Sequence, residues 1–397
     1  MSDPLGQSQV IPYLTDMHDN GYHVTILSCE KKYRYYDIRG HLKQYLSSNN
    51  IRWKNVKYKK NPPIFSTLWN MYFMYKKAEK LHRMYNFDII HCRSYLAIII
   101  GERLKKKYGL KLIFDMRGFW ADERVEGKIW NKNNLIYKFI YMYFKSKEKE
   151  HLLFSDYVVT LTNKSKDIIN NWNIIPPSKP IKVIPCCVDT NFFSQEKVKE
   201  RLIKLYTLLH KINKDDYIIS YLGSTGTWYL LDEMLIFFSF LLKNKPNAKF
   251  LFITKDSPKF IIARAKKHNI NKENIIVISA NREEVPTLIS LSHFSIFFIK
   301  PCFSKQASSP TKHGEVTSMG VPVICNAGIG DVDTIIKETN TGLIVDELSE
   351  KGYLETIKKL DEFYNNLDKV KIRKSAINYY SLEKGKNDYL SIYKEIL

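Results

Sequence analysis

Residues 308–331 read SSPTKHGEVTSMGVPVICNAGIGD, and this stretch shows the building unit of the fold. A polar loop leads into a helical pattern, a short apolar run follows at 321–326, and a turn rich in glycine comes next. Helix, buried strand and glycine turn in this order are typical of parallel α/β proteins. A lone Lys312 stands where the loop enters the helix, and Glu315 follows it by three residues.

The same unit recurs along the whole chain of 397 residues, which is too long for one ordinary core. Longer helical patterns, for example 64–84, 94–107 and 132–152, separate short apolar runs at 23–29, 87–92, 110–116, 156–161, 181–193, 217–223, 249–254, 274–279, 294–300 and 321–326. The pattern restarts near 185–195. It predicts the α/β class, with two tandem Rossmann-like, doubly wound domains at 1–187 and 188–375 that face each other across a cleft.

The first residues depart from this pattern. A doubly wound domain opens with a strand, but DPLGQSQV at 3–10 gives a glycine-containing loop, with a helix from about Ser8. Gly6 and Gln7 of this loop are candidate ligand contacts, because a glycine lets the backbone approach a phosphate. We expect the opening strand to lie upstream of Met1 or to have been lost by truncation.

The charge and residue composition indicate what kind of partner the chain binds. The net charge is +21, and residues 1–190 hold 32 Lys and Arg against 17 Asp and Glu, a net charge of +15. Such a basic half predicts an anionic partner, either membrane lipid or nucleic acid. The six cysteines show no metal-ligand spacing and are typical of buried free thiols. No apolar run is long enough to span a bilayer.

The loop before 312 is the strongest candidate site. Backbone N–H groups at a helix start favour an anion, and Lys312 adds a full positive charge. Glu315 can accept hydrogen bonds from two neighbouring hydroxyls, as on a ribose. A capping box with a surface salt bridge explains the same residues, and both interpretations stay open on this stretch alone. The hydroxyl donors of the loop are Ser308, Ser309 and Thr311.

Other candidates follow strand ends, where parallel sheets bind ligands. Gly223 and Gly226 let the backbone approach a phosphate, although a plain strand-to-helix turn has the same composition. Charged residues past the strand at 110–116 suit substrate contact, or form an Arg–Asp pair in a solvated loop. The candidates at these strand ends are Asp115, Arg117, Ser224, Thr225, Lys255, Asn281 and Arg282.

Asp331 and Asp333 form an Asp-x-Asp pair, a pattern that can hold a divalent metal beside a nucleotide diphosphate. We favour the simpler interpretation, in which one of them caps the helix that follows.

Residues 133–151 interleave Tyr, Phe and Ile with Lys at helical spacing, and 80–87 and 102–109 add further basic residues. Basic aromatic helices suit the surface of an anionic bilayer, although a core-facing stripe with a solvated basic face has the same spacing. The charge difference between the two halves favours the membrane.

The chain resembles the family-4 glycosyltransferases of the two-domain GT-B type over nearly its whole length. The resemblance rests on DPLGQSQVIPYL at the start, VIPCCVDTNFF at the domain junction, YLGSTGTWY at the second domain, and Glu-x-x-x-x-Gly-x-Pro-Val-Ile from Glu315 to Ile324. The last segment, 376–397, resembles the closing helix of the family, which crosses back to the first domain.

The resemblance implies a retaining hexosyltransferase that uses no metal and no cofactor. The second domain would bind a nucleotide sugar, a UDP-sugar by default and a GDP-sugar next, and the first domain would bind a lipid-linked or polysaccharide acceptor. It implies a role in lipopolysaccharide, capsule or exopolysaccharide biosynthesis, in the cytoplasm on the inner face of the plasma membrane. Glu315 matches the ribose-binding Glu of the family, Lys312 is positioned for the leaving diphosphate, and the base would lie near 281–285.

Two positions depart from the family. Many members have a Glu that contacts the donor sugar eight residues before the ribose Glu, and here Ala307 stands there. Where members often carry a His after the fourth strand, this chain offers Asp115 and Arg117, and we expect Arg117 to contact the acceptor or the diphosphate.

Three alternatives to the transferase stay open. A catalytically inactive GT-B partner subunit fits Ala307. A basic nucleic-acid-binding protein fits the charge, but no binding motif supports it, so we expect no nucleic-acid partner. A sugar-nucleotide epimerase is a weaker possibility. The sequence does not determine the base, the sugar, the acceptor or the linkage.

Overall fold

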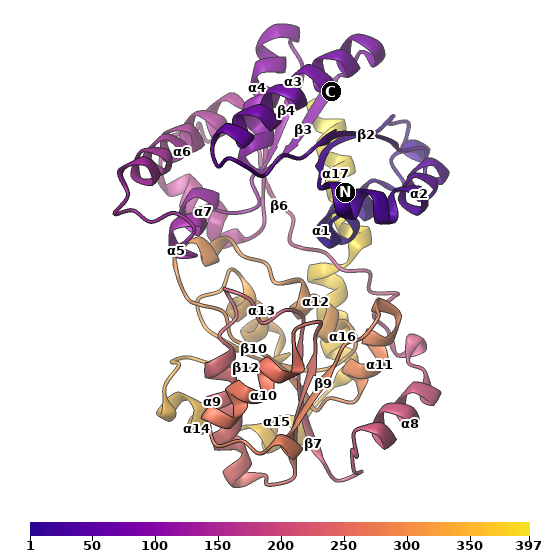
Figure 1. Cartoon of the computed structure of the whole chain (residues 1–397), viewed down its shortest axis with the longest axis vertical. Coiled ribbons are helices and arrows are strands. Elements are labelled where there is room, and N and C mark those ends of the chain that lie inside the picture. Colours follow the sequence, from indigo (N-terminus) through magenta and orange to yellow (C-terminus); the bar gives the residue numbers. More distant parts are fainter. The chain divides into compact units, whose positions relative to one another are not determined.

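The computed structural model describes every residue from Met1 to Leu397, and the chain divides into two compact units (Figure 1). Unit 1 comprises Met1–Asp122, Trp130–Cys187 and Leu382–Leu397. Unit 2 comprises Glu123–Ile129 and Val188–Ser381. Helix α5 (Trp120–Glu126) contributes residues to both units.

Unit 1 contains two parallel sheets with helices packed on them. One sheet has only β1 and β2, in a register that pairs Thr25 with Arg52, and the other has the order β3-β4-β5-β6. The strands are β1 (Thr25–Glu30), β2 (Arg52–Lys57), β3 (Ile89–Arg93), β4 (Lys111–Asp115), β5 (Tyr157–Thr160) and β6 (Ile181–Val183). The helices, besides α5, are α1 (Pro4–Gln9), α2 (Lys32–Ser48), α3 (Phe65–Tyr85), α4 (Tyr95–Tyr108), α6 (Leu135–Phe154), α7 (Asn163–Asn171) and α17 (Leu382–Ile396).

The first residues of the chain are helical. The expected loop at 3–10 and the helix start near Ser8 were wrong, because Pro4 occupies the first position of α1, where its fixed φ favours helix initiation. The backbone N–H of Ser2 donates to the Glu30 carboxylate at 3.0 Å, and the N-terminal ammonium group forms an ion pair with the same carboxylate. The N-terminus is therefore held at the end of β1.

Unit 2 is built on one parallel sheet with the strand order β12-β11-β10-β7-β8-β9. Its strands are β7 (Tyr217–Leu222), β8 (Ala248–Ile253), β9 (Ile275–Ile278), β10 (Phe294–Phe297), β11 (Val323–Asn326) and β12 (Gly342–Val345). Its helices, besides α5, are α8 (Glu200–Leu209), α9 (Leu231–Asn244), α10 (Pro258–Lys267), α11 (Val285–Ser290), α12 (Thr311–Ser318), α13 (Val332–Thr339), α14 (Glu350–Lys358), α15 (Leu360–Asn365) and α16 (Lys369–Tyr380).

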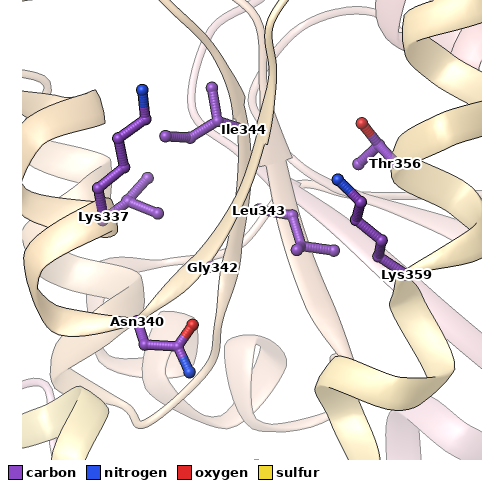
Figure 2. Close-up of a pocket in the computed structure, with 8 residues that line it drawn as sticks. Lys337, Asn340, Gly342, Leu343, Ile344, Thr356 and Lys359 are labelled. Carbon is purple, nitrogen blue, oxygen red and sulfur yellow. The ribbon is translucent and has the colours of Figure 1, made fainter.

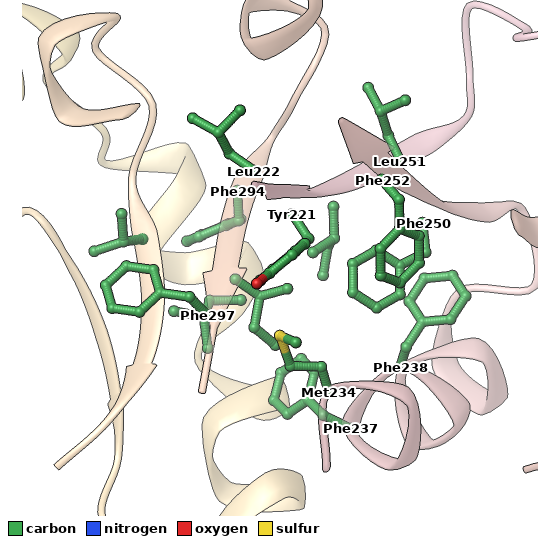
Figure 3. Close-up of a cluster of buried hydrophobic side chains, with 14 of the residues drawn as sticks. Tyr221, Leu222, Met234, Phe237, Phe238, Phe250, Leu251, Phe252, Phe294 and Phe297 are labelled. Atoms are coloured by element: carbon green, nitrogen blue, oxygen red, sulfur yellow. The ribbon is translucent and has the colours of Figure 1, made fainter. Parts of the chain in front are cut away.

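Aromatic side chains fill the core of unit 2 (Figure 3). The ring of Phe238, on α9, lies 5.0 Å from that of Phe250, which in turn lies 4.2 Å from that of Phe252. All six residues of β7 are buried, because helices cover both faces of a central parallel strand. The structure thus confirms the α/β class with parallel sheets that the continuous apolar runs predicted.

The last helix, α17, packs in unit 1. Tyr389, Ile392 and Tyr393 on this helix share a buried cluster with Ile113 of β4 and Val159 of β5. The chain therefore returns to unit 1 after α16 of unit 2. None of the helices has both the length and the apolar character that crossing a bilayer requires.

Candidate active site

The strands of unit 2 run parallel, so the loops that follow them meet at one edge of the sheet. The loop after β7 begins at Gly223, which has φ +101°, a conformation that glycine adopts without strain. The side chain of Lys312, at the second position of α12, approaches this loop. A Cβ atom on Gly223 would lie 3.6 Å from Lys312 Nζ. The structure thus brings two sequence-predicted stretches together.

Lys312 is a buried cation without an anionic partner. Its side chain is 6% exposed, and Nζ makes no hydrogen bond. The ammonium group instead lies 3.4 Å from the ring centroid of Tyr229 and 4.0 Å from that of Tyr221. Burial lowers the pKa of Lys312 well below its usual range, and the charges of Glu315 and Asp256 only partly oppose this. Such an amine attracts an anion that enters the loop.

Helix α12 begins directly after the polar loop 308–310. Its N-cap residue is Pro310, whose side chain makes no capping hydrogen bond, so the capping box suggested as an alternative is not formed here. Ser308, Ser309 and Thr311 are half-buried around this start. The first turn of α12 therefore has no cap from its N-cap side chain, and the partial positive charge of a helix start lies at the turn that contains Lys312.

A carboxylate occupies the glycine loop. Asp256, after β8, accepts from the Thr225 N–H at 2.5 Å and from the Thr225 hydroxyl at 2.7 Å. The Ser224 hydroxyl lies 3.3 Å from the same carboxylate. Burial raises the pKa of Asp256, but these hydrogen bonds outweigh it and the net pKa is lowered. The loop donors that would hold a phosphate are therefore bound to an internal anion.

Sequence reasoning selected Lys255 in this segment and missed Asp256 as the partner of the loop. Lys255 is exposed. Tyr221 and Tyr229 were also missed, although two aromatic residues flanking a glycine loop are a signal that the sequence offers.

Glu315 is half-buried one turn after the start of α12. Burial raises its pKa, and the charges of Arg282 and Lys312 oppose that increase. Arg282 is exposed after β9, with its guanidinium carbon 5.1 Å from the ring centroid of Phe192. Asn281 forms a capping box with Glu284, in which the Asn281 N–H donates to the Glu284 carboxylate at 2.8 Å. Electrostatics thus link Glu315 to both Lys312 and Arg282.

An ion pair between Lys305 and Glu123 lies against Trp228, which follows the glycine loop. Lys305 is buried, with Nζ 2.9 Å from Glu123 and 3.7 Å from the ring centroid of Trp228. Gly127 leaves room for this ring, since a Cβ there would lie 2.8 Å from Trp228. Segment 123–129 therefore supports the glycine loop of unit 2.

Unit 1 contains a separate charged cluster at the end of β4. Asp115 is 1% exposed, and its carboxylate lies 3.3 Å from Arg93, 3.6 Å from His91 and 3.8 Å from Arg117. Tyr389 of α17 donates to it at 3.1 Å. Burial raises the pKa of Asp115, but the cations, Arg117 first, hold it well below its usual range. Asp115 and Arg117 therefore form the Arg–Asp pair named as the alternative to substrate contact, but around a buried carboxylate and not in a solvated loop.

Arg117 has φ +58°, an unusual conformation for a residue with a side chain. Burial lowers the pKa of its guanidinium, but nearby groups, Asp115 first, outweigh this and the net pKa is raised. Nη2 donates to the Cys186 sulfur at 3.2 Å, whereas Nη1 and Asp115 Oδ1 are buried without a hydrogen bond. Such strain and unsatisfied polar atoms are typical of functional sites.

Gly6 and Gln7 lie on α1 in unit 1, not in a loop. Gly6 is buried, and a Cβ there would lie 2.7 Å from the Met1 Cα. The Gln7 side chain donates to the Ser2 carbonyl at 3.3 Å. These contacts hold the N-terminus, and nothing in unit 1 tests the predicted contact with a donor.

The Asp-x-Asp pair lies at the start of α13, with Asp331 at the N-cap position and Asp333 in the first turn, but the Asp331 side chain does not form the expected capping hydrogen bond. No group of three or more His, Cys, Asp or Glu side chains is arranged to hold a metal ion. A pocket of about 200 Å³ lies by the edge strand β12, with Lys337 and Lys359 on either side (Figure 2). It contains none of the sequence-predicted site residues.

Two family models match the chain and together cover most of it. Residues 9–192 match Glycosyltransferase Family 4, and residues 209–376 match Glycosyl transferases group 1. The chain is a glycosyltransferase of the two-domain GT-B type. A search of curated proteins found no significant match.

Solved structures share the fold of this GT-B glycosyltransferase. A glycosyltransferase from Rickettsia africae is 18% identical with a TM-score of 0.69, covering 97% of this chain and 93% of its own. WaaG, a glycosyltransferase involved in lipopolysaccharide biosynthesis, is 14% identical with a TM-score of 0.67, covering 97% and 95%. Anabaena HepE in complex with UDP and glucose is 12% identical with a TM-score of 0.63, covering 89% and 88%. At these identities the likeness shows the fold, and it confirms two Rossmann-like domains.

Proposed function

We propose that the chain transfers a hexose from a nucleoside-diphosphate sugar to a lipid-linked or polysaccharide acceptor, with retention of configuration and without a metal. The observation that carries the proposal is the buried Lys312 amine, which makes no hydrogen bond and lies in the first turn of α12 beside the glycine loop. A diphosphate is the anion that fits a full charge beside two sets of backbone N–H groups.

The chemistry follows from charge development. As the glycosidic bond breaks, the leaving diphosphate gains negative charge, and a preorganised cation in a dry site stabilises it. Lys312 would supply that charge, with the Thr225 N–H and the α12 N–H groups as further donors. This field supports a reaction without a metal.

The remaining donor contacts are proposed from position. Glu315 would accept from the ribose hydroxyls, and the base would lie near Asn281 and Arg282. Ser308, Ser309 and Thr311 would contact the sugar or the diphosphate, since Ala307 provides no carboxylate for the sugar. UDP is the first candidate for the nucleotide, as in the HepE complex, and GDP is the second.

Arg117 and Asp115 would serve the acceptor side. Arg117 retains a free buried Nη1 that a phosphate or hydroxyl of the acceptor can use, and Asp115 holds it in position. We place the reaction on the cytoplasmic face of a membrane, in lipopolysaccharide or capsule synthesis, as WaaG acts in lipopolysaccharide biosynthesis.

A turnover assay tests the proposal. The protein is incubated with UDP- and GDP-hexoses and a membrane lipid extract, with and without a chelator, and released nucleotide is measured. We expect release to depend on the extract, to survive chelation and to fall at least tenfold in Arg117→Ala at saturating substrate. An α-linked product from an α-linked donor, seen by NMR, would support retention. Release of a free epimerised sugar without an acceptor would contradict the transferase.

A further inference from the structure

Helix α3 of unit 1 turns its aromatic side chains to solvent. Phe65 is 72% exposed and Leu68 is 59% exposed. Their spacing continues one turn at a time along a single face, as in an amphipathic helix whose apolar face has no protein partner. We call this face the α3 stripe, and its members are Phe65, Leu68, Trp69, Tyr72 and Phe73.

A neighbouring face of α3 carries the buried polar side chains of Ser66 and Asn70, which fix the helix in this rotation. The Asn70 side chain accepts from the Lys59 N–H at 2.9 Å and donates to the Lys59 carbonyl at 2.8 Å. The Ser66 hydroxyl donates to the Lys60 carbonyl at 2.9 Å. Turning the stripe inward would break these hydrogen bonds and leave buried polar groups unsatisfied. The exposure of the stripe is therefore built into the packing.

Positive charge surrounds the stripe. Lys59 and Lys60 are exposed in the segment that Asn70 and Ser66 hold, and Lys59 Nζ lies 3.6 Å from the ring centroid of Trp69. Lys76 and Lys80 are exposed farther along α3. Aromatic side chains next to lysines suit the headgroup region of an anionic bilayer, where rings enter the interface and ammonium groups meet phosphates.

Helix α6 repeats the arrangement. Leu135 at its start is 81% exposed, and the first half of the helix continues with exposed Ile136, Phe139, Met142 and Tyr143. Lys132 and Lys138 are exposed beside them. Helix α4 packs against both α3 and α6. In both helices these clustered, exposed apolar residues lie in the first half.

We propose that unit 1 docks on an anionic bilayer through the α3 stripe, with the start of α6 as a second contact. The proposed function enters this proposal at one point only, which is that a lipid-linked acceptor would lie in the bilayer. The positive charge of this half of the chain favours anionic lipid over a second copy of the chain as the partner of the stripe. Residues 1–190 carry a net charge of +15, so a second copy would bring like charge to the same face, whereas anionic lipid complements it.

Vesicle co-sedimentation tests the proposal with full-length protein. The vesicles contain phosphatidylcholine alone, or phosphatidylcholine and phosphatidylglycerol in equal parts. The test variant carries Phe65→Ser, Leu68→Ser and Trp69→Ser. The matched control carries Leu205→Ser, Leu208→Ser and Leu209→Ser on α8 of unit 2, where Leu208 is 78% exposed. The melting-temperature shift with UDP is measured on all three proteins, because docking and donor binding are independent.

We expect the wild type and the α8 control to bind the anionic vesicles, and the α3 variant to bind about tenfold more weakly or worse. Binding of the wild type should weaken with salt and on vesicles of phosphatidylcholine alone. Equal vesicle binding by the α3 variant and the wild type would overturn the proposal. So would a wild type that self-associates through this face, seen as a dimer that only the α3 variant loses. An unchanged UDP shift in the α3 variant separates either result from failure of the donor site.

Discussion

The Lys312 ammonium group lies 3.4 Å from the ring centroid of Tyr229 and makes no hydrogen bond. A cation–π contact contributes about 0.5–2 kcal/mol, which is less than a buried charge loses on leaving water. The charged form of Lys312 is therefore disfavoured in the ligand-free site, and an anion that enters the site favours it again.

The first prediction concerns proton uptake. Burial lowers the pKa of Lys312 from 10.5, and a bound diphosphate would raise it again. Between the lowered pKa and about 10.5, binding of UDP or GDP should take up a proton and weaken as the pH rises. Calorimetry in buffers of different ionisation enthalpy measures this uptake. Lys312→Arg, which keeps its charge at all these pH values, should bind without uptake. Uptake that persists in Lys312→Arg would assign the proton elsewhere.

The lowered pKa of Lys312 should also make the free energy of unfolding depend on pH. In this pH window the unfolded chain binds one more proton at residue 312 than the folded chain, so the free energy of unfolding should increase as the pH rises towards 10.5. Urea unfolding of the ligand-free protein measures the slope. Compared with Lys312→Met, the wild type should show the steeper rise, and equal slopes would contradict the lowered pKa.

Asp256 should compete with the donor. Its carboxylate occupies the Thr225 N–H, the donor that we assign to a phosphate. Asp256→Asn keeps an acceptor oxygen and removes the charge, so diphosphate affinity should increase about fivefold, which corresponds to about 1 kcal/mol. A calorimetric titration measures it. Asp256→Ala is the control, since it removes the loop contact as well and should not show the same gain. Weaker binding in Asp256→Asn would mean that Asp256 only orders the loop.

The Asp115 cluster should depend on α17. Tyr389→Phe removes a hydrogen bond to a buried carboxylate and should lower the free energy of unfolding by about 1.5–3 kcal/mol. Tyr393→Phe, on the same helix, removes a hydrogen bond to His91 Nδ1 and should cost about 0.5–1.5 kcal/mol. Chemical denaturation compares the two variants. A larger loss in Tyr393→Phe would contradict the ranking of the two contacts.

Gly314 sets the packing of α12 in unit 2. A Cβ at this position would lie 2.9 Å from the Tyr380 side chain and 3.1 Å from that of Val188. Gly314→Ala should therefore destabilise unit 2 by about 1–3 kcal/mol. Gly226→Ala is the matched control, because its Cβ would come no closer than 3.6 Å to a neighbour and should be tolerated. Thermal unfolding distinguishes the two variants. Equal melting temperatures would show that Tyr380 and Val188 can move to accommodate the added methyl group.

Much of the fold could be predicted because buried parallel strands are continuous apolar runs. β7 and β8 stand out in the sequence for this reason. β2 was missed, because its sequence RWKNVK is largely polar and only Trp53 is fully buried. β12 has only four residues and gave no separate signal.

The sequence identified the loops that form the candidate site, but not which of their side chains contact one another. Lys312 and Gly223 are far apart in sequence, and only the parallel sheet brings them together. The choice of Asp256 over Lys255 as the partner of Thr225 depends on side-chain direction after β8, which spacing alone does not encode.

A thermal-shift panel of UDP, GDP, CMP, ADP and their sugar conjugates, on the wild type and Lys312→Ala, tests whether Lys312 binds the diphosphate of a nucleotide donor. A ligand that binds only the folded state raises the melting temperature by mass action. We expect a shift with one nucleoside diphosphate and its sugar conjugate, and its loss or reduction in Lys312→Ala. An equal shift in both proteins would place the diphosphate away from Lys312, and no shift with any nucleotide would contradict a donor site in unit 2.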